Sequence, residues 1–178
     1  RCAAHVFGVE FHAALANLAL DRMQQLAYDN VQIICGDGTL GWPEQAPFDA
    51  ILVSAGGPAV PQSLLEQLKI GGRLVIPVGD EPRTQELLRI DRTGEHAFAR
   101  KSLGRVQFVP LVGTEGWSLD GMPVPSHRDR RPLRITKTTR SRLTSLISDA
   151  CEPFDEIESA DLQPLLSRIG PAKIVLIG

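Results

Sequence analysis

The sequence lacks any apolar run of the roughly 18 residues that a membrane-spanning helix needs. No secretory signal pattern opens it either. Cysteine is scarce: Cys2, Cys35 and Cys151 are the three in 178 residues. They are too few and too widely separated for a disulfide framework, and Cys35 has the setting of a buried reduced thiol. We therefore expect a protein of the cytoplasm with no membrane partner.

Strong charge and catalytic signature motifs are also missing. The net charge of −2 argues against a general nucleic-acid binder, although a local basic patch stays possible. The four histidines have no metal-ligand spacing with one another or with a cysteine, so we expect no metal site. Neither a G-x-S-x-G elbow nor a P-loop occurs, which argues against serine hydrolases and P-loop NTPases.

Two short apolar runs, Val31–Cys35 and residues 48–54, stand out in what is present. Each is rich in β-branched or other apolar residues and ends in a turn of small or acidic residues. Buried parallel strands have this appearance. In an open α/β sheet the ligand lies outside the carboxyl ends of such strands. The turns at residues 36–38 and 55–58 are therefore the first candidates for chemistry.

The remaining pattern predicts alternating strands and helices. Residues 3–10, 73–78, 85–91 and 105–111 are expected to be strands, and residues 11–28 and 62–68 helices, with a hairpin turn at residues 91–95. Apolar residues make up 43% of the chain, enough for a packed core. The order predicts a doubly wound α/β sheet, mostly parallel, that closes with an antiparallel hairpin.

Two acidic residues at strand ends are candidate ligand contacts. Glu10 ends the first strand, where Rossmann-like sheets use a carboxylate to accept hydrogen bonds from ribose hydroxyls. Asp37 offers a second acceptor, suited to an exocyclic amine. Glu10 could instead be a surface residue or a helix cap, and Asp37 a helix cap or a turn acid. The small residues from Ser54 to Pro61 either let a ligand or another backbone come close or serve turn geometry alone.

The character of the chain changes after residue 113. Residues 126–142 hold seven basic residues and one acid, with no interleaved aromatics; we expect a solvated connector, with an anionic-partner patch as the alternative. Residues 143–151 and a segment starting at Asp161 resemble helices, and Lys173–Ile177 a strand. No methionine opens the sequence, so we expect a piece of a longer chain.

A series of short motifs in this sequence resembles the protein-L-isoaspartate O-methyltransferases over roughly residues 4–117. The most specific part is GDGTLGWPEQAPFDAILVSAG (residues 36–56) joined to GGRLVIPVG (residues 71–79). Supporting matches are Gly8-Val9-Glu10, Asn30-Val31, Pro58-x-x-Pro61, Leu64-x-x-Gln67-Leu68, Gln85-Glu86-Leu87 and Phe108-Val109-Pro110-Leu111.

This resemblance implies a Rossmann-like class I methyltransferase sheet that binds S-adenosylmethionine. The family methylates the α-carboxyl of L-isoaspartyl residues in damaged proteins, so protein or peptide substrates are implied as partners. By motif, Glu10 would hold the ribose, and Asp37 with Gly38 the adenine. Ser54, Ala55, Gly56 and Pro58 would lie beside the substrate carboxylate.

The sequence also departs from that family. The first sheet strand, its glycine-rich loop and an upstream substrate loop would all precede Arg1. Because that strand lies in mid-sheet, between those ending at Glu10 and Ser54, we expect a slot with unpaired backbone groups on both sides. Ala55-Gly56-Gly57 replaces the family's usual alanines. The segment from Asp161 to Gly178 has a weaker similarity to the start of an erythromycin-esterase-like domain.

These patterns divide the chain into a partial methyltransferase domain (residues 1–117), a basic linker (118–150) and the possible start of a second domain (151–178). A non-catalytic remnant that acts as a scaffold in a fusion protein is the main alternative function. A nicotinamide-dependent Rossmann enzyme would fit Glu10, but neither the Gly-Asp-Gly turn nor the terminal hairpin.

Overall fold

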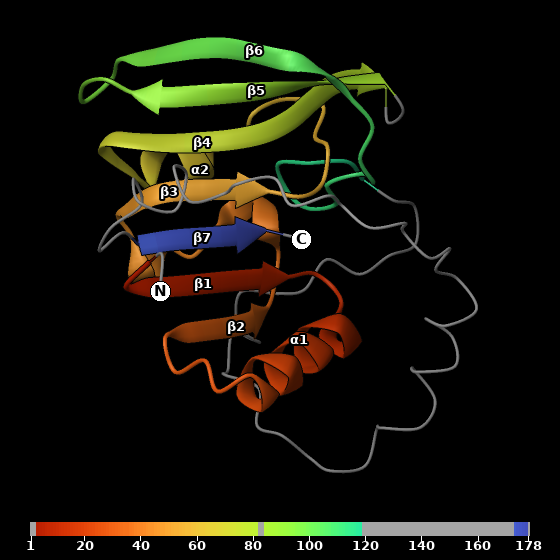
Figure 1. Cartoon of the computed structure of the whole chain (residues 1–178). Helices are drawn as coiled ribbons and strands as arrows, with labels where there is room; N and C mark the ends of the chain where they lie inside the picture. The colour runs from red at the N-terminus through yellow and green to blue at the C-terminus, as the bar shows by residue number, and fades with distance from the viewer. Residues whose placement is uncertain (1–2, 82–83, 119–172, 178) are drawn as a thin grey trace, which may run out of the picture.

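The computed structural model describes residues 3–81, 84–118 and 173–177. In these residues one sheet of seven strands has the order β2-β1-β7-β3-β4-β5-β6 (Figure 1). The bounds are β1 His5–Glu10, β2 Val31–Cys35, β3 Phe48–Val53, β4 Leu68–Glu81, β5 Thr84–Arg92, β6 Phe98–Val106 and β7 Lys173–Ile177. The strands from β2 to β4 pair in parallel, and β5 and β6 add an antiparallel hairpin. The expected fold class is confirmed.

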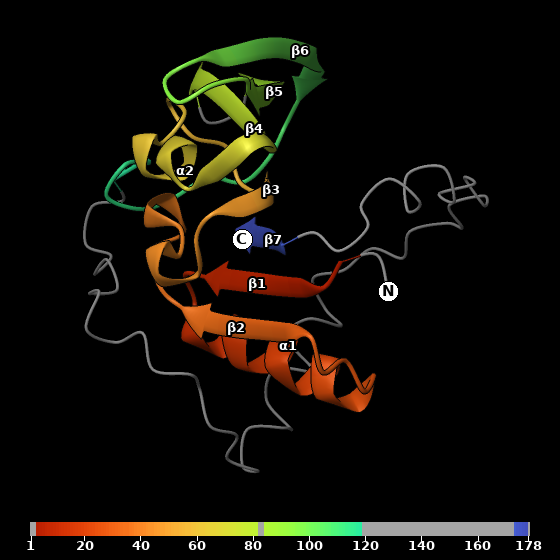
Figure 2. The same cartoon turned by 90° about the vertical axis from the view of Figure 1, so that its left-hand side faces the viewer.

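Helices lie on both sides of this sheet. α1 (Ala13–Gln25) lies in front of the β2 end in Figure 1, and α2 (Gln62–Glu66) lies behind β3 and β4. Figure 2 shows the same two helices on opposite sides of the strands. Two 3₁₀ turns, η1 (Gly38–Leu40) and η2 (Pro43–Gln45), connect β2 to β3. This arrangement is the doubly wound one that alternating strands and helices predict.

The core lies on the α2 side of the sheet. Alternate residues of the parallel strands point into it and are almost fully buried, because successive side chains of a strand face opposite sides. The ring of Phe7 meets those of Trp42 and Phe48 edge to face, with centroids 5.5 and 5.8 Å apart. On the opposite face, Leu52 and Leu176 are about 40% exposed (39% and 41%).

The outer hairpin differs from the sequence prediction. The turn expected at residues 91–95 is present two residues later, where Thr93 N–H donates to Ala97 O (2.8 Å). The prediction of a strand at residues 105–111 was wrong, because the strand that pairs with β5 is Phe98–Val106. Almost all of β6 is exposed, so it carries no apolar alternation that would mark it as a strand. Pro110 forms only an isolated bridge with Gly56.

The start of β4 also differs from expectation. The sequence predicted a helix to residue 68 and a strand from residue 73, but β4 already begins at Leu68 and runs through Gly71 and Gly72. Its register with β3 shifts between Phe48 and Ala50, and Gly71 has φ of 85°. A left-handed residue inside a strand is typical of a bulge, and glycine adopts it without a Cβ penalty.

The main correction concerns the middle of the sheet. The expected slot between β1 and β3 is filled: β7 pairs in parallel with β1 on one side and with β3 on the other. Figure 1 shows this blue strand between the red and orange ones. The backbone groups that the sequence analysis left unpaired therefore have partners, although the glycine-rich loop expected after that strand is not among the described residues.

Lys173–Ile177 thus belongs to the same sheet as residues 3–81, although these five residues were expected in a second domain. Other expectations lie outside the described residues: the basic run at residues 126–142, the helices predicted at residues 143–151 and after Asp161, and the domain boundary at 150/151. The boundary expected at 117/118 falls at the end of a described segment, which stops at Ser118.

Candidate functional site at the carboxyl edge of the parallel strands

The carboxyl ends of β2, β1, β7 and β3 lie side by side at one edge of the sheet (Figure 1). Backbone bonds join the residues just beyond the strands: Gly36 N–H donates to Glu10 O (2.9 Å), and Ser54 N–H donates to Ile177 O (2.7 Å). The structure therefore brings the acidic turn and the small-residue loop of the sequence analysis to a single edge. Ligands of open α/β sheets bind at such an edge.

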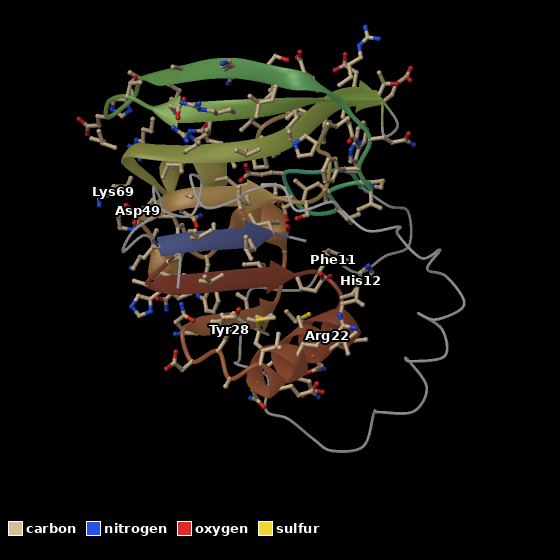
Figure 3. The ribbon with its side chains drawn as sticks, viewed as in Figure 1. Phe11, His12, Arg22, Tyr28, Asp49 and Lys69 are labelled. Atoms are coloured by element: carbon tan, nitrogen blue, oxygen red, sulfur yellow. The ribbon has the colours of Figure 1, made fainter. Side chains whose placement is uncertain are left out.

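Glu10 is half-buried at the end of β1. Its Oε1 accepts a hydrogen bond from the backbone N–H of His12 (2.8 Å), which orders the turn into α1. Figure 3 shows Phe11 and His12 just beyond the strand, and their rings meet edge to face with centroids 5.4 Å apart. Because His12 is the N-cap residue of α1, this bond orders the turn before the helix and does not cap the N–H groups of its first turn. A carboxylate has about four lone-pair sites, so this bond leaves acceptor capacity for hydroxyl groups.

Asp37 is buried (3% exposed) and is the N-cap residue of η1. Its Oδ1 accepts from Thr39 N (2.9 Å) and Thr39 Oγ1 (2.6 Å), and its Oδ2 accepts from Thr114 N (2.7 Å). The capping role that the sequence allowed is therefore observed. These three donors hold the carboxylate in one orientation, and one of its roughly four lone-pair sites stays available to a further donor.

Close backbone approach explains the glycine after Asp37. A Cβ added to Gly38 would come within 2.3 Å of Ile177 Cγ2. On the other side of the carboxylate, a Cβ at Gly113 would lie 2.1 Å from Asp37 Oδ1. The Gly-Asp-Gly turn is thus packed between the end of β7 and the segment that follows β6, so that small residues are needed on both sides.

The loop from Ser54 to Pro58 is partly accessible. Ser54 is exposed and Pro58 half-buried, whereas Ala55 and Gly56 are buried. The backbone of Gly56 is fully engaged: its N–H donates to Val109 O (2.7 Å), and its O accepts from Leu111 N (2.8 Å) and Trp117 Nε1 (2.9 Å). Close approach of another backbone, one of the two alternatives for this loop, is observed here.

Two buried glutamines that the sequence analysis gave no role hold these loops. Gln85 Oε1 accepts from Phe108 N (2.8 Å) and its Nε2 donates to Phe108 O (3.1 Å), and a Cβ on Gly56 would lie 2.3 Å from the Gln85 side chain. Gln67 Oε1 accepts from Trp42 N (2.8 Å), and its Nε2 donates to Leu40 O and Ser63 O (both 2.9 Å). Both glutamines stand in the resemblance motifs, and that was the available signal.

In the described part of the chain, the carboxylates with shifted pKa values lie away from the candidate edge, near the amino ends of the parallel strands. A hydrogen bond from the Lys173 backbone lowers the pKa of Asp49; burial opposes this, and Lys69 (Nζ–Oδ1 3.1 Å) adds to it. Figure 3 shows Asp49 and Lys69 at the end away from Phe11 and His12. These ion pairs therefore stabilise the sheet and leave the candidate edge unaffected.

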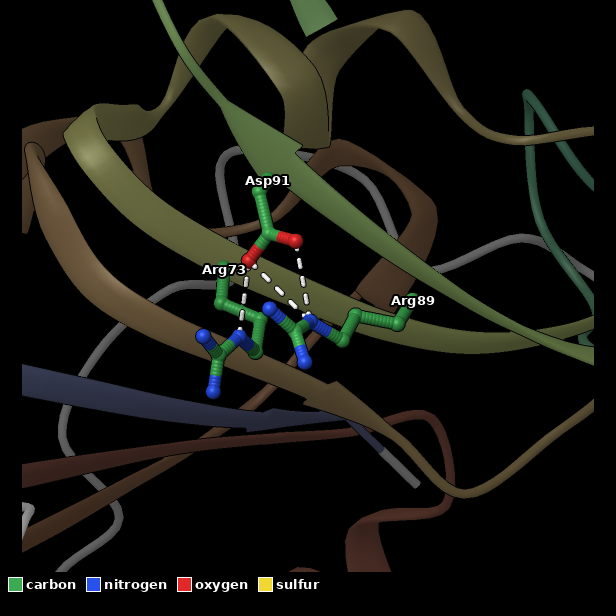
Figure 4. A network of polar contacts seen from close by, with 3 residues as sticks. All are labelled: Arg73, Arg89 and Asp91. Atoms are coloured by element: carbon green, nitrogen blue, oxygen red, sulfur yellow. Dashed lines mark hydrogen bonds and ion pairs between the residues drawn. The ribbon is translucent and has the colours of Figure 1, made fainter. Parts of the chain in front are cut away.

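A second carboxylate with a lowered pKa joins β4 to β5. Burial raises the pKa of Asp91, but hydrogen bonds from Arg73 (Nε–Oδ1 2.8 Å) and Arg89 (Nε–Oδ2 2.9 Å) outweigh it, so that the net shift is downward (Figure 4). Asp91 pairs with Arg73 across the strands, near the start of β3. This network also lies away from the candidate edge.

Residues 3–81, 84–118 and 173–177 bring together no group of three or more histidine, cysteine, aspartate or glutamate side chains able to hold a metal ion. Within the same residues, no helix has the length and apolar character to cross a membrane. The side chain of Cys35 is half-buried, and its Sγ donates to Phe11 O (3.5 Å).

Curated proteins similar to this chain have the name of the family that the sequence motifs resemble. A protein-L-isoaspartate O-methyltransferase of Rhodopseudomonas palustris is 53% identical over 129 residues, which are 72% of this chain and 58% of the relative. One from Pelotomaculum thermopropionicum is 57% identical over 112 residues, 63% of this chain and 48% of the relative. The chain thus spans about half the length of the curated relatives it matches.

Solved structures agree on the fold. A protein-L-isoaspartate O-methyltransferase superimposes with a TM-score of 0.59 at 29% identity, covering 63% of this chain and 35% of the other. A β-aspartate methyltransferase of Plasmodium falciparum, in complex with S-adenosyl-L-homocysteine, gives a TM-score of 0.53 at 30% identity and covers 61% and 52%. The sequence model described as "Protein-L-isoaspartate(D-aspartate) O-methyltransferase (PCMT)" matches residues 1–116. The chain therefore belongs to the protein-L-isoaspartate O-methyltransferase family.

Proposed function

We propose that this protein transfers a methyl group from S-adenosylmethionine to the carboxyl group of isoaspartyl residues in damaged proteins. The observation that carries the proposal is the arrangement of residues at the carboxyl edge of the parallel strands. Glu10, the Asp37 turn and the loop at residues 54–58 come together there in a chain whose family model covers residues 1–116. The named relatives have this activity in their names, and one solved relative holds the demethylated cofactor.

The donor set at the edge suits such a cofactor. Glu10 keeps acceptor capacity that two adjacent ribose hydroxyls could use. Asp37 is held by Thr39 and Thr114 with capacity for one more donor, as an adenine amine would supply, and the adjacent Gly38 lets β7 pack beside this turn. When bound, S-adenosylmethionine supplies a methyl group already activated by its sulfonium.

The substrate side would use the exposed end of the loop. Ser54 is exposed and Pro58 half-buried, so these two could contact a peptide, whereas buried Ala55 and Gly56 would support the loop from within. During transfer a carboxylate oxygen–carbon bond forms and the sulfur–carbon bond breaks, and no proton has to move. Positioning the carboxylate in line would therefore supply most of the rate.

A methyl-transfer assay tests the proposal. The full chain is incubated with methyl-labelled S-adenosylmethionine and either an isoaspartyl peptide or the same peptide with a normal aspartyl residue. Label on the isoaspartyl peptide alone is the expected result. A folded chain that transfers no label and binds no S-adenosylhomocysteine in a calorimetric titration would overturn the proposal and favour the scaffold alternative.

A further inference from the structure

The strand at the centre of the sheet comes from a distant part of the chain. β7 lies between β1 and β3, yet Lys173 hydrogen-bonds to Asp49 across 124 residues of sequence. The preceding described residue is Ser118, so residues 119–172 separate β7 from the rest of the sheet in sequence. The free-energy cost of closing a loop rises only slowly with its length, so a segment this far along the chain still reaches the slot at little extra cost.

Contacts made by β7 itself are extensive. Five of its residues pair with β1, and four pair with β3. Val175 and Ile177 are completely buried in the core (0% exposed). Their burial removes apolar surface from water and so favours the segment in this position. An extended segment is thus recognised on both edges through its backbone and on one face through alternate side chains.

Both ends of β7 are also held by specific polar contacts. At its start, Lys173 N–H donates to Asp49 Oδ2 (2.9 Å), and Lys173 Nζ donates to Gln45 O (3.1 Å). At its end, Ile177 O accepts from Ser54 N (2.7 Å), and Ile177 packs against Gly38. These contacts set the register of the segment along the slot, because a shift by one residue would place Leu176 in the core.

We propose that the slot between β1 and β3 is a peptide-binding site whose ligand is the segment Lys173–Ile177. The segment is held by contacts of its own, so we expect the slot to accept it also when it is supplied as a separate chain. Addition of an extended peptide to open strand edges is an established mode of recognition. The proposal concerns folding and assembly and does not depend on the proposed methyl transfer.

The test uses the full chain and a fluorescent peptide with the sequence of residues 172–178. In the double variant V175D/I177D the chain's own strand cannot enter the core, so the slot becomes available. We expect this variant to bind the peptide at least tenfold more tightly than the unchanged chain does. L176D is the matched control: its side chain is 41% exposed, so the slot stays occupied and peptide binding stays as weak as for the unchanged chain.

A second peptide that carries the V175D change should not bind any of the three proteins. If V175D/I177D is unfolded by circular dichroism, the unchanged peptide should restore a cooperative thermal transition. Equal binding of the two peptides, or equal binding to the double variant and the unchanged chain, would overturn the proposal. Failure of the peptide to bind the folded double variant, or to restore folding of an unfolded one, would also overturn it.

Discussion

The parallel and antiparallel parts of this sheet are stabilised in different ways. The parallel strands β1, β7 and β3 place completely buried side chains such as Ile51 and Val175 in one core and depend on a segment from far along the chain. The hairpin of β5 and β6 is local in sequence, its outer strand is exposed, and an aspartate between two arginines joins it to β4. Substitutions should therefore cost much at the buried positions of the first part and little at the exposed positions of β6.

The largest difference is expected between two neighbours on β3. Ile51 is completely buried and Leu52 is 39% exposed on the other face. Ile51→Ala should lower the free energy of unfolding by about 2–5 kcal/mol, because it leaves a cavity in the core. Leu52→Ala should cost less than about 1 kcal/mol. Urea unfolding of both variants measures this, and equal losses would contradict the assignment of the core to the α2 side.

Gly56→Ala should have the next largest effect. The new methyl group would lie 2.3 Å from the Gln85 side chain, so the loop or the glutamine must move, at a cost of about 1–3 kcal/mol. Gly94→Ala is the control, since its Cβ would meet only Ala97 at 3.4 Å. If residues 54–58 face the substrate, Gly56→Ala should also raise the KM for an isoaspartyl peptide, measured by label transfer, while Gly94→Ala leaves it unchanged.

Thr39→Val tests whether the orientation of Asp37 matters. It keeps the shape of a fully buried side chain but removes the hydroxyl that donates to Asp37 and accepts from Glu115 N (3.1 Å). Loss of these bonds should cost about 1–3 kcal/mol in urea unfolding. We also expect weaker binding of S-adenosylhomocysteine by calorimetry. Unchanged affinity in this variant and in Asp37→Ala would rule out the adenine assignment.

The smallest effect is expected from acid. The pKa values of Asp49 and Asp91 are lowered on folding from the usual 3.8, so their contribution is complete above that pH and lost as the pH falls through the folded values. The urea concentration at the unfolding midpoint should therefore fall when the pH is lowered below about 4. This fall should be smaller in Asp91→Asn, which lacks one of the two carboxylates. Arg89→Met should cost no more than about 1 kcal/mol at pH 7, since its pair with Asp91 is partly exposed.

The strands of the parallel part were easier to predict from the sequence than those of the antiparallel part. The bounds of β2 were predicted as observed, and the strand ending at Glu10 and the strand before Ser54 were nearly so, because buried apolar runs with turn residues behind them are a local signal. β6 was misplaced since an exposed edge strand carries no such pattern. Gln67 and Gln85 received no role because their partners, the backbones of residues 40–42 and 108, are distant in sequence.

The sequence by itself determined the α/β class, the family resemblance and the placement of Glu10, Asp37 and the Ser54 loop at strand ends, since each depends on residues near one another in the chain. It also predicted that Lys173–Ile177 forms a strand. Only the tertiary structure decided where that strand goes. Its place between β1 and β3 depends on backbone pairing and core burial across 124 residues, which no local pattern records.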